Sequence, residues 1–209
     1  MVSALLVALS LAAEPELASE KRQGAVVAPA ALPPGTLALY GIVGAPEVGA
    51  GYRQGIAGIE LEAKALFNVF EVSGLLEGGM KVQVLRTERF ALAPGVALGL
   101  KLNSGSKYFD AGNFGYLGLR PRVSVNATYT FSDVIEGVAQ LEVPLTLPLT
   151  AQGVQFTPLL GAGAEFAVGG NLTLLGTAHL GLDVVKEPLG VPQTRAAWGV
   201  RLGVGYRLF

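Results

Sequence analysis

The chain has 209 residues, of which 51% are hydrophobic and only 15% are charged, against about 25% charged residues in soluble domains. Its 29 glycines argue against long helices, and the absence of cysteine excludes disulfide frameworks and thiolate metal sites. Basic and acidic residues nearly balance, 15 against 16, so nothing indicates a nucleic-acid partner. The composition leaves an unusually apolar soluble fold or a membrane protein.

The N-terminus has the composition of an export signal. Val2 to Ala13 carries no charge, which suits the hydrophobic region of a signal peptide and is too short to span a bilayer. No Lys or Arg precedes this run, so either the true start lies upstream or the run is a buried helix. We expect a signal peptide over residues 1–12, an Ala/Pro-rich linker over 13–35 and one further domain over 36–209.

Membrane-spanning helices are not indicated beyond the N-terminus. The longest uncharged stretch past residue 100, Val143 to Ala164, contains Pro144, Pro148 and Pro158 and several polar side chains. Three prolines in one span are incompatible with a helix in hydrocarbon.

Alternation of apolar and polar residues dominates the chain from about residue 36. Between Leu117 and Phe131 the odd positions are almost all apolar, while the even positions are Gly, Arg, Ser, Asn and Thr. Period two is the pattern of a strand with one apolar face. It predicts an all-β fold with about ten strands (eight to ten), over 36–44, 47–54, 57–67, 72–86, 90–102, 115–131, 134–149, 153–168, 171–186 and 194–209. The first two segments are alternatively one bent strand, or 47–67 one long strand.

The polar face identifies the solvent on each side of the sheet. It is rich in Gly, Ala, Thr and Ser, as expected where side chains must fit inside a narrow barrel. Aromatic residues on the apolar face gather at strand ends, and Phe156 and Phe166 lie ten residues apart, about 25 Å along the membrane normal at ~40° tilt. The pattern predicts a transmembrane antiparallel up-and-down β-barrel with interfacial aromatics Phe67, Phe90, Tyr129, Phe131, Phe156, Phe166, Trp198 and Tyr206.

Loop lengths agree with this architecture. The connections at 87–89, 132–133 and 169–171 are short, whereas 103–114 and 187–193, at the other end of the strands, are longer. Short periplasmic turns and longer external loops are typical of outer-membrane barrels.

The C-terminal sequence resembles that of outer-membrane β-barrel proteins of Gram-negative bacteria, of the small porin-like and OmpA-like type. Arg201, Gly203, Tyr206 and Leu208 fill the positions of that family's assembly signal, and Phe209 ends the chain, although on the opposite face from Tyr206. The resemblance implies an outer-membrane location reached through the periplasm, contact with the lipid bilayer and recognition by the barrel-assembly machinery. The subfamily and the oligomeric state are left open.

Charged residues of both signs take the parity of the barrel interior. In one of two registers of the hairpin at Ser132-Asp133, Arg122 faces Glu142, and buried ions must be paired. We therefore predict a largely filled, salt-bridged lumen with a polar network of Glu60, Glu62, Lys64, Arg120, Arg122, Glu136, Glu142, Glu165, His179, Asp183, Arg195, Arg201 and Arg207.

No catalytic centre is indicated. His179 is the single histidine, and Asp183 on the same face lies about 13 Å further along the strand, too far for a dyad. No cofactor and no metal ligand set is predicted. We expect a non-enzymatic outer-membrane barrel, structural or a narrow pore for small solutes. The alternatives are a barrel enzyme at the external rim and a secreted soluble barrel that binds an apolar ligand.

Overall fold

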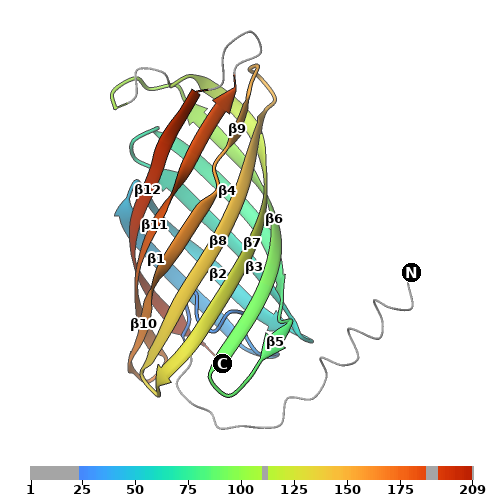
Figure 1. The fold of residues 1–209 in the computed structure, drawn as a ribbon, viewed down its shortest axis with the longest axis vertical. Coiled ribbons are helices and arrows are strands. Elements are labelled where there is room, and N and C mark those ends of the chain that lie inside the picture. Colours follow the sequence, from blue (N-terminus) through green and yellow to red (C-terminus); the bar gives the residue numbers. More distant parts are fainter. Residues whose placement is uncertain (1–23, 110–112, 187–192, 209) are drawn as a thin grey trace, which may run out of the picture.

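The computed structural model describes residues 24–109, 113–186 and 193–208, and within these it consists of strands and connecting turns (Figure 1). None of the described segments is a helix long and apolar enough to cross a membrane. The strands are β1 (Leu37–Ala45), β2 (Glu47–Ile56), β3 (Ile59–Asn68), β4 (Ser73–Val82), β5 (Leu85–Arg86), β6 (Phe90–Ser104), β7 (Gly115–Ser132), β8 (Ile135–Pro148), β9 (Val154–Phe156), β10 (Leu159–Gly169), β11 (Leu172–Lys186) and β12 (Gln193–Arg207).

The strands form one closed antiparallel sheet. Each long strand pairs with its neighbours in the chain, and β1 pairs with β12, which joins the first and last strands and closes the barrel. The short β5 continues β4 along β6, and the short β9 continues β10 along β8 and β11. Counted in this way the wall has ten strands, so the all-β up-and-down barrel predicted from the alternation is confirmed at the upper strand number.

Two of the predicted strands are interrupted. The segment predicted as 72–86 breaks at residues 83–84, and the segment predicted as 153–168 breaks at Thr157 and Pro158. Proline has no N–H to donate to the ladder, which accounts for the second break. The first two predicted strands are separate, with the turn at Pro46 between them.

Side chains alternate between lipid and lumen along each strand. On β11, Leu180 is 70% exposed whereas its neighbour His179 is 2% exposed. The outer face carries a coat of exposed Leu, Val and Phe side chains, and the buried set is dominated by charged and polar ones. This is the reverse of a soluble barrel, whose apolar residues point inward.

The two ends of the barrel differ. At one end, here the turn end, the strands are joined by the tight turns at 57–58, 87–89, 133–134 and 170–171. The other end, here the loop end, carries the connections 105–114 and 149–153 as well as the 187–192 segment, which lies outside the described residues. Figure 1 shows the C-terminal end of β12 at the turn end.

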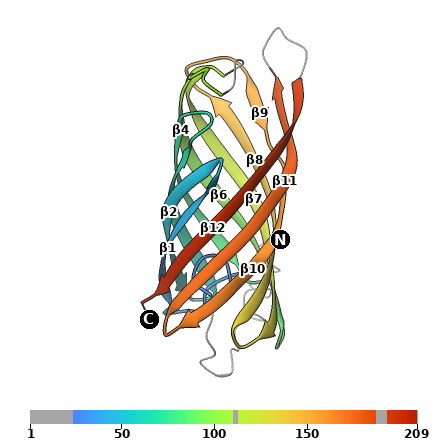
Figure 2. The same ribbon diagram turned by 90° about the vertical axis from the view of Figure 1, so that its left-hand side faces the viewer.

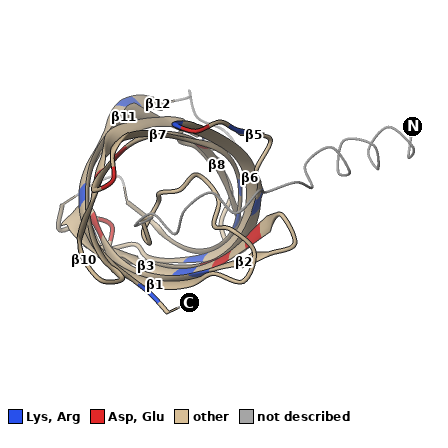
Figure 3. Ribbon diagram, turned by 90° about the horizontal axis from the view of Figure 1, so that it is seen from below, with Lys and Arg blue, Asp and Glu red and all other residues tan. Residues whose placement is uncertain are grey.

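The N-terminal segment folds into the lumen. Residues 24–33, which belong to the stretch expected as a linker, enter the ring of strands at the turn end (Figure 3). Ala25, Ala28 and Ala30 are fully buried there. We call residues 24–33 the plug.

Candidate functional site

The plug is anchored on one carboxylate of the barrel wall. Glu165, on β10, accepts hydrogen bonds from four successive backbone N–H groups, those of residues 25–28, at 2.6–2.9 Å. The Thr173 hydroxyl on β11 donates a fifth, at 2.7 Å. Glu136 accepts the N–H of Gly24 at 3.1 Å. A carboxylate wrapped by consecutive N–H groups is a charge-assisted arrangement, stronger than ordinary backbone hydrogen bonding.

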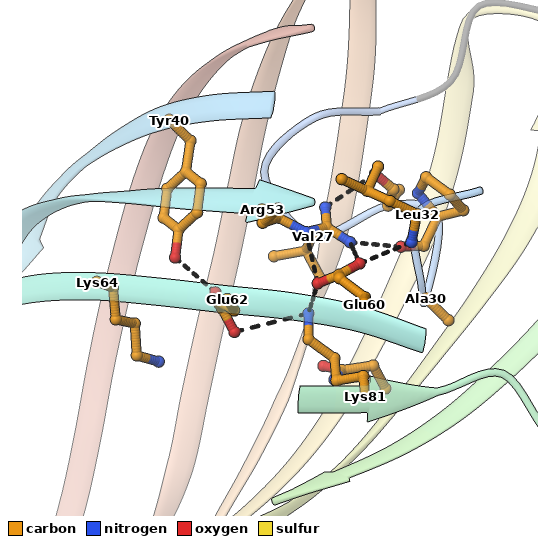
Figure 4. Close-up of polar contacts among 12 residues, drawn as sticks. Val27, Ala30, Leu32, Tyr40, Arg53, Glu60, Glu62, Lys64 and Lys81 are labelled. Carbon is orange, nitrogen blue, oxygen red and sulfur yellow. Dashed lines mark hydrogen bonds and ion pairs between the residues drawn. The ribbon is translucent and has the colours of Figure 1, made fainter. Parts of the chain in front are cut away.

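A second anchor lies on β2 and β3 (Figure 4). The fully buried Arg53 makes a two-pronged pair with Glu60 at 2.8 and 2.9 Å and also donates to the carbonyl oxygens of Ala28 and Pro29. Glu60 in turn accepts the N–H of Leu32 at 2.6 Å. The plug is thus held at both its N–H and C=O groups.

Basic and acidic side chains continue this cluster toward the middle of the barrel. Lys81 on β4 contacts Glu60 at 2.6 Å and Glu62 at 3.7 Å. The Tyr40 hydroxyl donates to Glu62 at 2.6 Å, and its ring lies against Gly51, where any side chain would collide with it. Buried charges paired in this way avoid the cost of an isolated ion.

Small side chains make room for the plug. Val26 and Ala28 pack against Tyr40, Val138 and Leu175. A Cβ built on Gly205 would lie 2.8 Å from atoms of Ala25 and Val26, closer than real Cβ contacts. The lumen-facing glycines of β12 therefore accommodate the plug.

A belt of ion pairs crosses the middle of the lumen. Glu77 on β4 contacts Lys64 at 3.1 Å and is bound by the Arg122 guanidinium, which also reaches Glu142 at 3.2 Å. Arg120 reaches Glu77 only at 3.9 Å. Arg122 lies opposite Pro144 in the register and meets Glu142 diagonally, not directly across as one predicted register had it.

A cavity of about 510 Å³ opens above this belt at the loop end, and we call it the vestibule. The described charged residues that line it form pairs: Lys101 with Glu71, Arg201 with Glu47 and Arg195 with Asp183, at 2.6–2.9 Å. Phe70, Phe109 and Trp198 line it as well. The vestibule, the belt and the plug follow one another from the loop end to the turn end.

The residues predicted for the lumen network fall into these three layers. Glu60, Glu62, Glu136 and Glu165 lie around the plug, Lys64, Arg122 and Glu142 in the belt, and Arg120, His179, Asp183, Arg195 and Arg201 line the vestibule. Arg207 is partly exposed at the end of β12, and the Arg195 side chain is 49% exposed.

Several charged residues of the lumen were missed from sequence. Arg53, Glu77, Lys81 and Lys101 are all buried and ion-paired. Each lies in the first half of the chain, where the alternation is less regular. Strand parity still applies there: Glu77 and Lys81 share the parity of Leu75 on β4, and all three are buried.

His179 does not meet Asp183. The His179 Nε2 atom lies 3.2 Å from the Thr177 hydroxyl, while the Asp183 carboxylate accepts hydrogen bonds from Gln155, Thr157 and Arg195. Within the described residues no group of three or more His, Asp or Glu side chains is placed to hold a metal ion.

The predicted interfacial aromatics are on the outer face. Phe67, Tyr129, Phe131, Phe156, Phe166, Trp198 and Tyr206 are exposed, between 39% and 66%, and Phe90 is partly exposed. On β12, Trp198 and Tyr206 are separated by eight residues of alternating apolar exposure. The assembly-signal residues Arg201, Gly203, Tyr206 and Leu208 lie on or directly after β12, whereas Phe209 lies outside the described residues.

A closed barrel with an apolar outer coat and a charged interior is a transmembrane β-barrel of the outer-membrane type. No protein-family model matches the chain, and neither does any curated protein. Among solved structures, the chain is similar to a KdgM porin in complex with disordered oligogalacturonate (TM-score 0.47, 9% identity, 82% of this chain and 98% of that one). It is also similar to a bacterial polysaccharide outer membrane secretin (TM-score 0.46, 11% identity, 80% and 58%). A de novo designed transmembrane β-barrel matches with TM-score 0.35 and 16% identity over 85% and 99%. These values are too low to transfer a function.

Proposed function

We propose that this protein is a narrow pore of the outer membrane for small polar solutes, closed at its periplasmic end by the plug, and that it catalyses no reaction. In this orientation the turn end faces the periplasm and the loop end the outside, as in outer-membrane barrels generally. The signal peptide over 1–12 and insertion by the barrel-assembly machinery belong to the same proposal.

The mode of attachment of the plug carries this proposal. The plug is bound through side-chain carboxylates and one guanidinium, and its residues take no part in the strand ladders. It can therefore leave the lumen without breaking the hydrogen bonds of the wall. The anchoring carboxylates would be re-solvated on opening, which keeps the two states close in free energy.

The layers above the plug suit passage of small polar solutes. The vestibule supplies an aqueous space at the outer end, and the belt supplies charges of both signs. The rim-enzyme alternative lacks support because His179 is held by Thr177 rather than by an acid. The soluble-barrel alternative requires apolar residues inside, and here they face outward.

The test is conductance in planar lipid bilayers. We expect the full chain to be closed for most of the time, with rare brief openings, and a variant lacking residues 24–33 to conduct continuously. Heat-modifiable migration on gels establishes that both barrels are folded. A folded deletion variant that stays silent would leave only a structural role.

A reversible lock provides the matched control. Ala30 of the plug and Ala93 of β6 pack in one buried cluster, and the natural chain has no cysteine. Replacing both by cysteine creates a single possible disulfide between plug and wall. We expect oxidation to abolish the rare openings and reduction to restore them, whereas either single variant should not respond to oxidant.

A further inference from the structure

The barrel wall has a notch at the loop end. The pairing of β12 with β1 ends at Val200 and Ala45, so residues 193–199 of β12 are paired with β11 on one side only. The cause is the early turn at Pro46, and Figure 2 shows β1 and β2 (blue) ending well below the tips of β11 and β12 (red). Pro46 and residues 196–199 of β12 line the vestibule, so the notch opens into it.

The notch lies at the level of the outer lipid head groups. Trp198 is the aromatic residue on the lipid face of this part of β12, and Trp marks the boundary between hydrocarbon and water. An unpaired strand edge is not tolerated deeper, in the hydrocarbon, where unsatisfied backbone groups cost several kcal/mol each. An opening at this level reaches molecules that lie in the outer leaflet.

Aromatic side chains cover the notch without closing it by hydrogen bonds. Phe70, from the connection between β3 and β4, lies with its ring 6.4 Å from that of Trp198 and 5.4 Å from that of Phe109. All three rings line the vestibule and are exposed. Trp198 is opposite Leu180, which is 70% exposed, so this apolar surface continues into the lipid-facing coat.

The inner side of the notch carries a surplus positive charge. The described charged residues of the vestibule are Lys101, Arg120, Arg195 and Arg201 against Glu47, Glu71 and Asp183, with His179 neutral. Three of the cations are paired closely with these three carboxylates. Arg120 reaches only Glu77, at 3.9 Å, and Glu77 is already shared by Lys64 and Arg122.

We propose that the notch is a lateral opening that binds an anionic amphiphile of the outer leaflet. Its phosphate or carboxylate group lies in the vestibule near Arg120, and its apolar tail lies along Phe70 and Trp198 in the lipid-facing surface. Arginine suits this role because its planar guanidinium binds such groups with two parallel hydrogen bonds. Binding here does not depend on conduction through the plugged end, so the pore proposal stands or fails separately.

Trp198 is the single tryptophan of the chain and therefore reports on the notch directly. The protein is placed in phosphatidylcholine vesicles containing a lipid with brominated tails, which quenches tryptophan on contact. The head group of this lipid is either phosphatidic acid or phosphatidylcholine. We expect phosphatidic acid to be favoured at Trp198 by about threefold or more, the range of a partly exposed charge contact. Equal quenching by the two lipids would overturn the proposal.

Two substitutions and one free ion separate the explanations. Arg120→Gln should remove the preference, as should Arg195→Gln in part, whereas Arg207→Gln at the opposite end of β12 should retain it. Heat-modifiable migration establishes that each variant is folded. Inorganic phosphate alone should leave Trp198 emission unchanged. A preference lost equally in Arg207→Gln would mean general surface charge, and a response to inorganic phosphate would mean a free-anion site; either result refutes amphiphile binding.

Discussion

Single carboxylates decide the state of the lumen. Glu165 gathers five hydrogen bonds, four of them from the plug, and Glu77 is shared by three cations of the belt. Both side chains are almost completely buried, so neither can exchange its protein partners for water while the plug is in place. Substitution at these two positions therefore separates plug binding from barrel stability.

Glu165→Gln is expected to loosen the plug without unfolding the barrel. A neutral amide keeps the volume but loses the charge-assisted character of the hydrogen bonds to residues 25–28, a loss of about 2 kcal/mol or about 30-fold in plug occupancy. Amide hydrogen exchange of residues 25–28 should accelerate accordingly, while exchange in the β10–β11 ladder stays unchanged.

Glu136→Gln is the matched control for that measurement. Glu136 also lies beside the plug but accepts only the N–H of Gly24, at 3.1 Å. We expect a much smaller effect on exchange. Equal acceleration in the two variants would contradict the role assigned to Glu165.

Arg122→Ala is expected to destabilise the barrel itself. Removing the guanidinium leaves Glu77 and Glu142 close together in the lumen with one cation fewer, and breaking a buried pair costs about 3–5 kcal/mol. Equilibrium unfolding in denaturant, from lipid vesicles, measures the loss. Arg207→Ala at the partly exposed end of β12 should change the free energy of unfolding by less than about 0.5 kcal/mol, and a similar loss in both variants would argue against the belt.

At the scale of the strand, position along the membrane normal sets the cost of a polar residue. On β12 the lipid-facing residues run from Trp198 to Tyr206, with Leu202 midway between these two aromatics. The alternation was readable from sequence over almost all of β12. The interruption of β9 and β10 and the early turn at Pro46 became evident only with the sheet, because they depend on which neighbour each strand pairs with.

Leu202→Arg is expected to cost about 2–4 kcal/mol of unfolding free energy, the penalty for arginine at the bilayer midplane, whereas Leu208→Arg near the end of the strand should cost about 0–1 kcal/mol. Leu202 is 60% and Leu208 39% exposed, so neither substitution fills the lumen. Reversible unfolding from lipid vesicles measures both. Equal costs at the two positions would contradict the membrane placement of β12.

For the molecule as a whole, the lumen is a stack of three layers with mixed charge. The plug fills the turn end, the belt joins opposite walls, and the vestibule is open at the loop end and at the notch. Pairing is nearly complete among the described charges of the belt and vestibule. A pore lined in this way has little net charge to select between ions.

The variant lacking residues 24–33 is therefore expected to show a reversal potential near zero in a potassium chloride gradient. Adding Arg122→Gln removes one positive charge at the narrow belt and should shift the reversal potential toward cation selectivity. Measurement in planar bilayers tests both statements. Strong selectivity of the deletion variant alone would show that ions do not pass the belt as described.

The sequence by itself determined the barrel, its strand number and which side chains face lipid. These properties follow from a local rule, because successive residues of a strand alternate between two faces and the composition of each face reveals its solvent. His179 and Leu180 illustrate it: parity alone separates the buried residue from the exposed one.

Only the tertiary structure decided what fills the lumen. The contacts of Glu165 with residues 25–28 span about 140 positions of the chain, and Arg122 meets Glu77 across the barrel. No periodicity relates such residues, since their meeting depends on closure of the sheet and on register. The absence of charge over 24–35 was the one local sign that this segment is not a solvated linker. Its position became defined only when the wall placed Glu165, Arg53 and Glu60 around one end of the barrel.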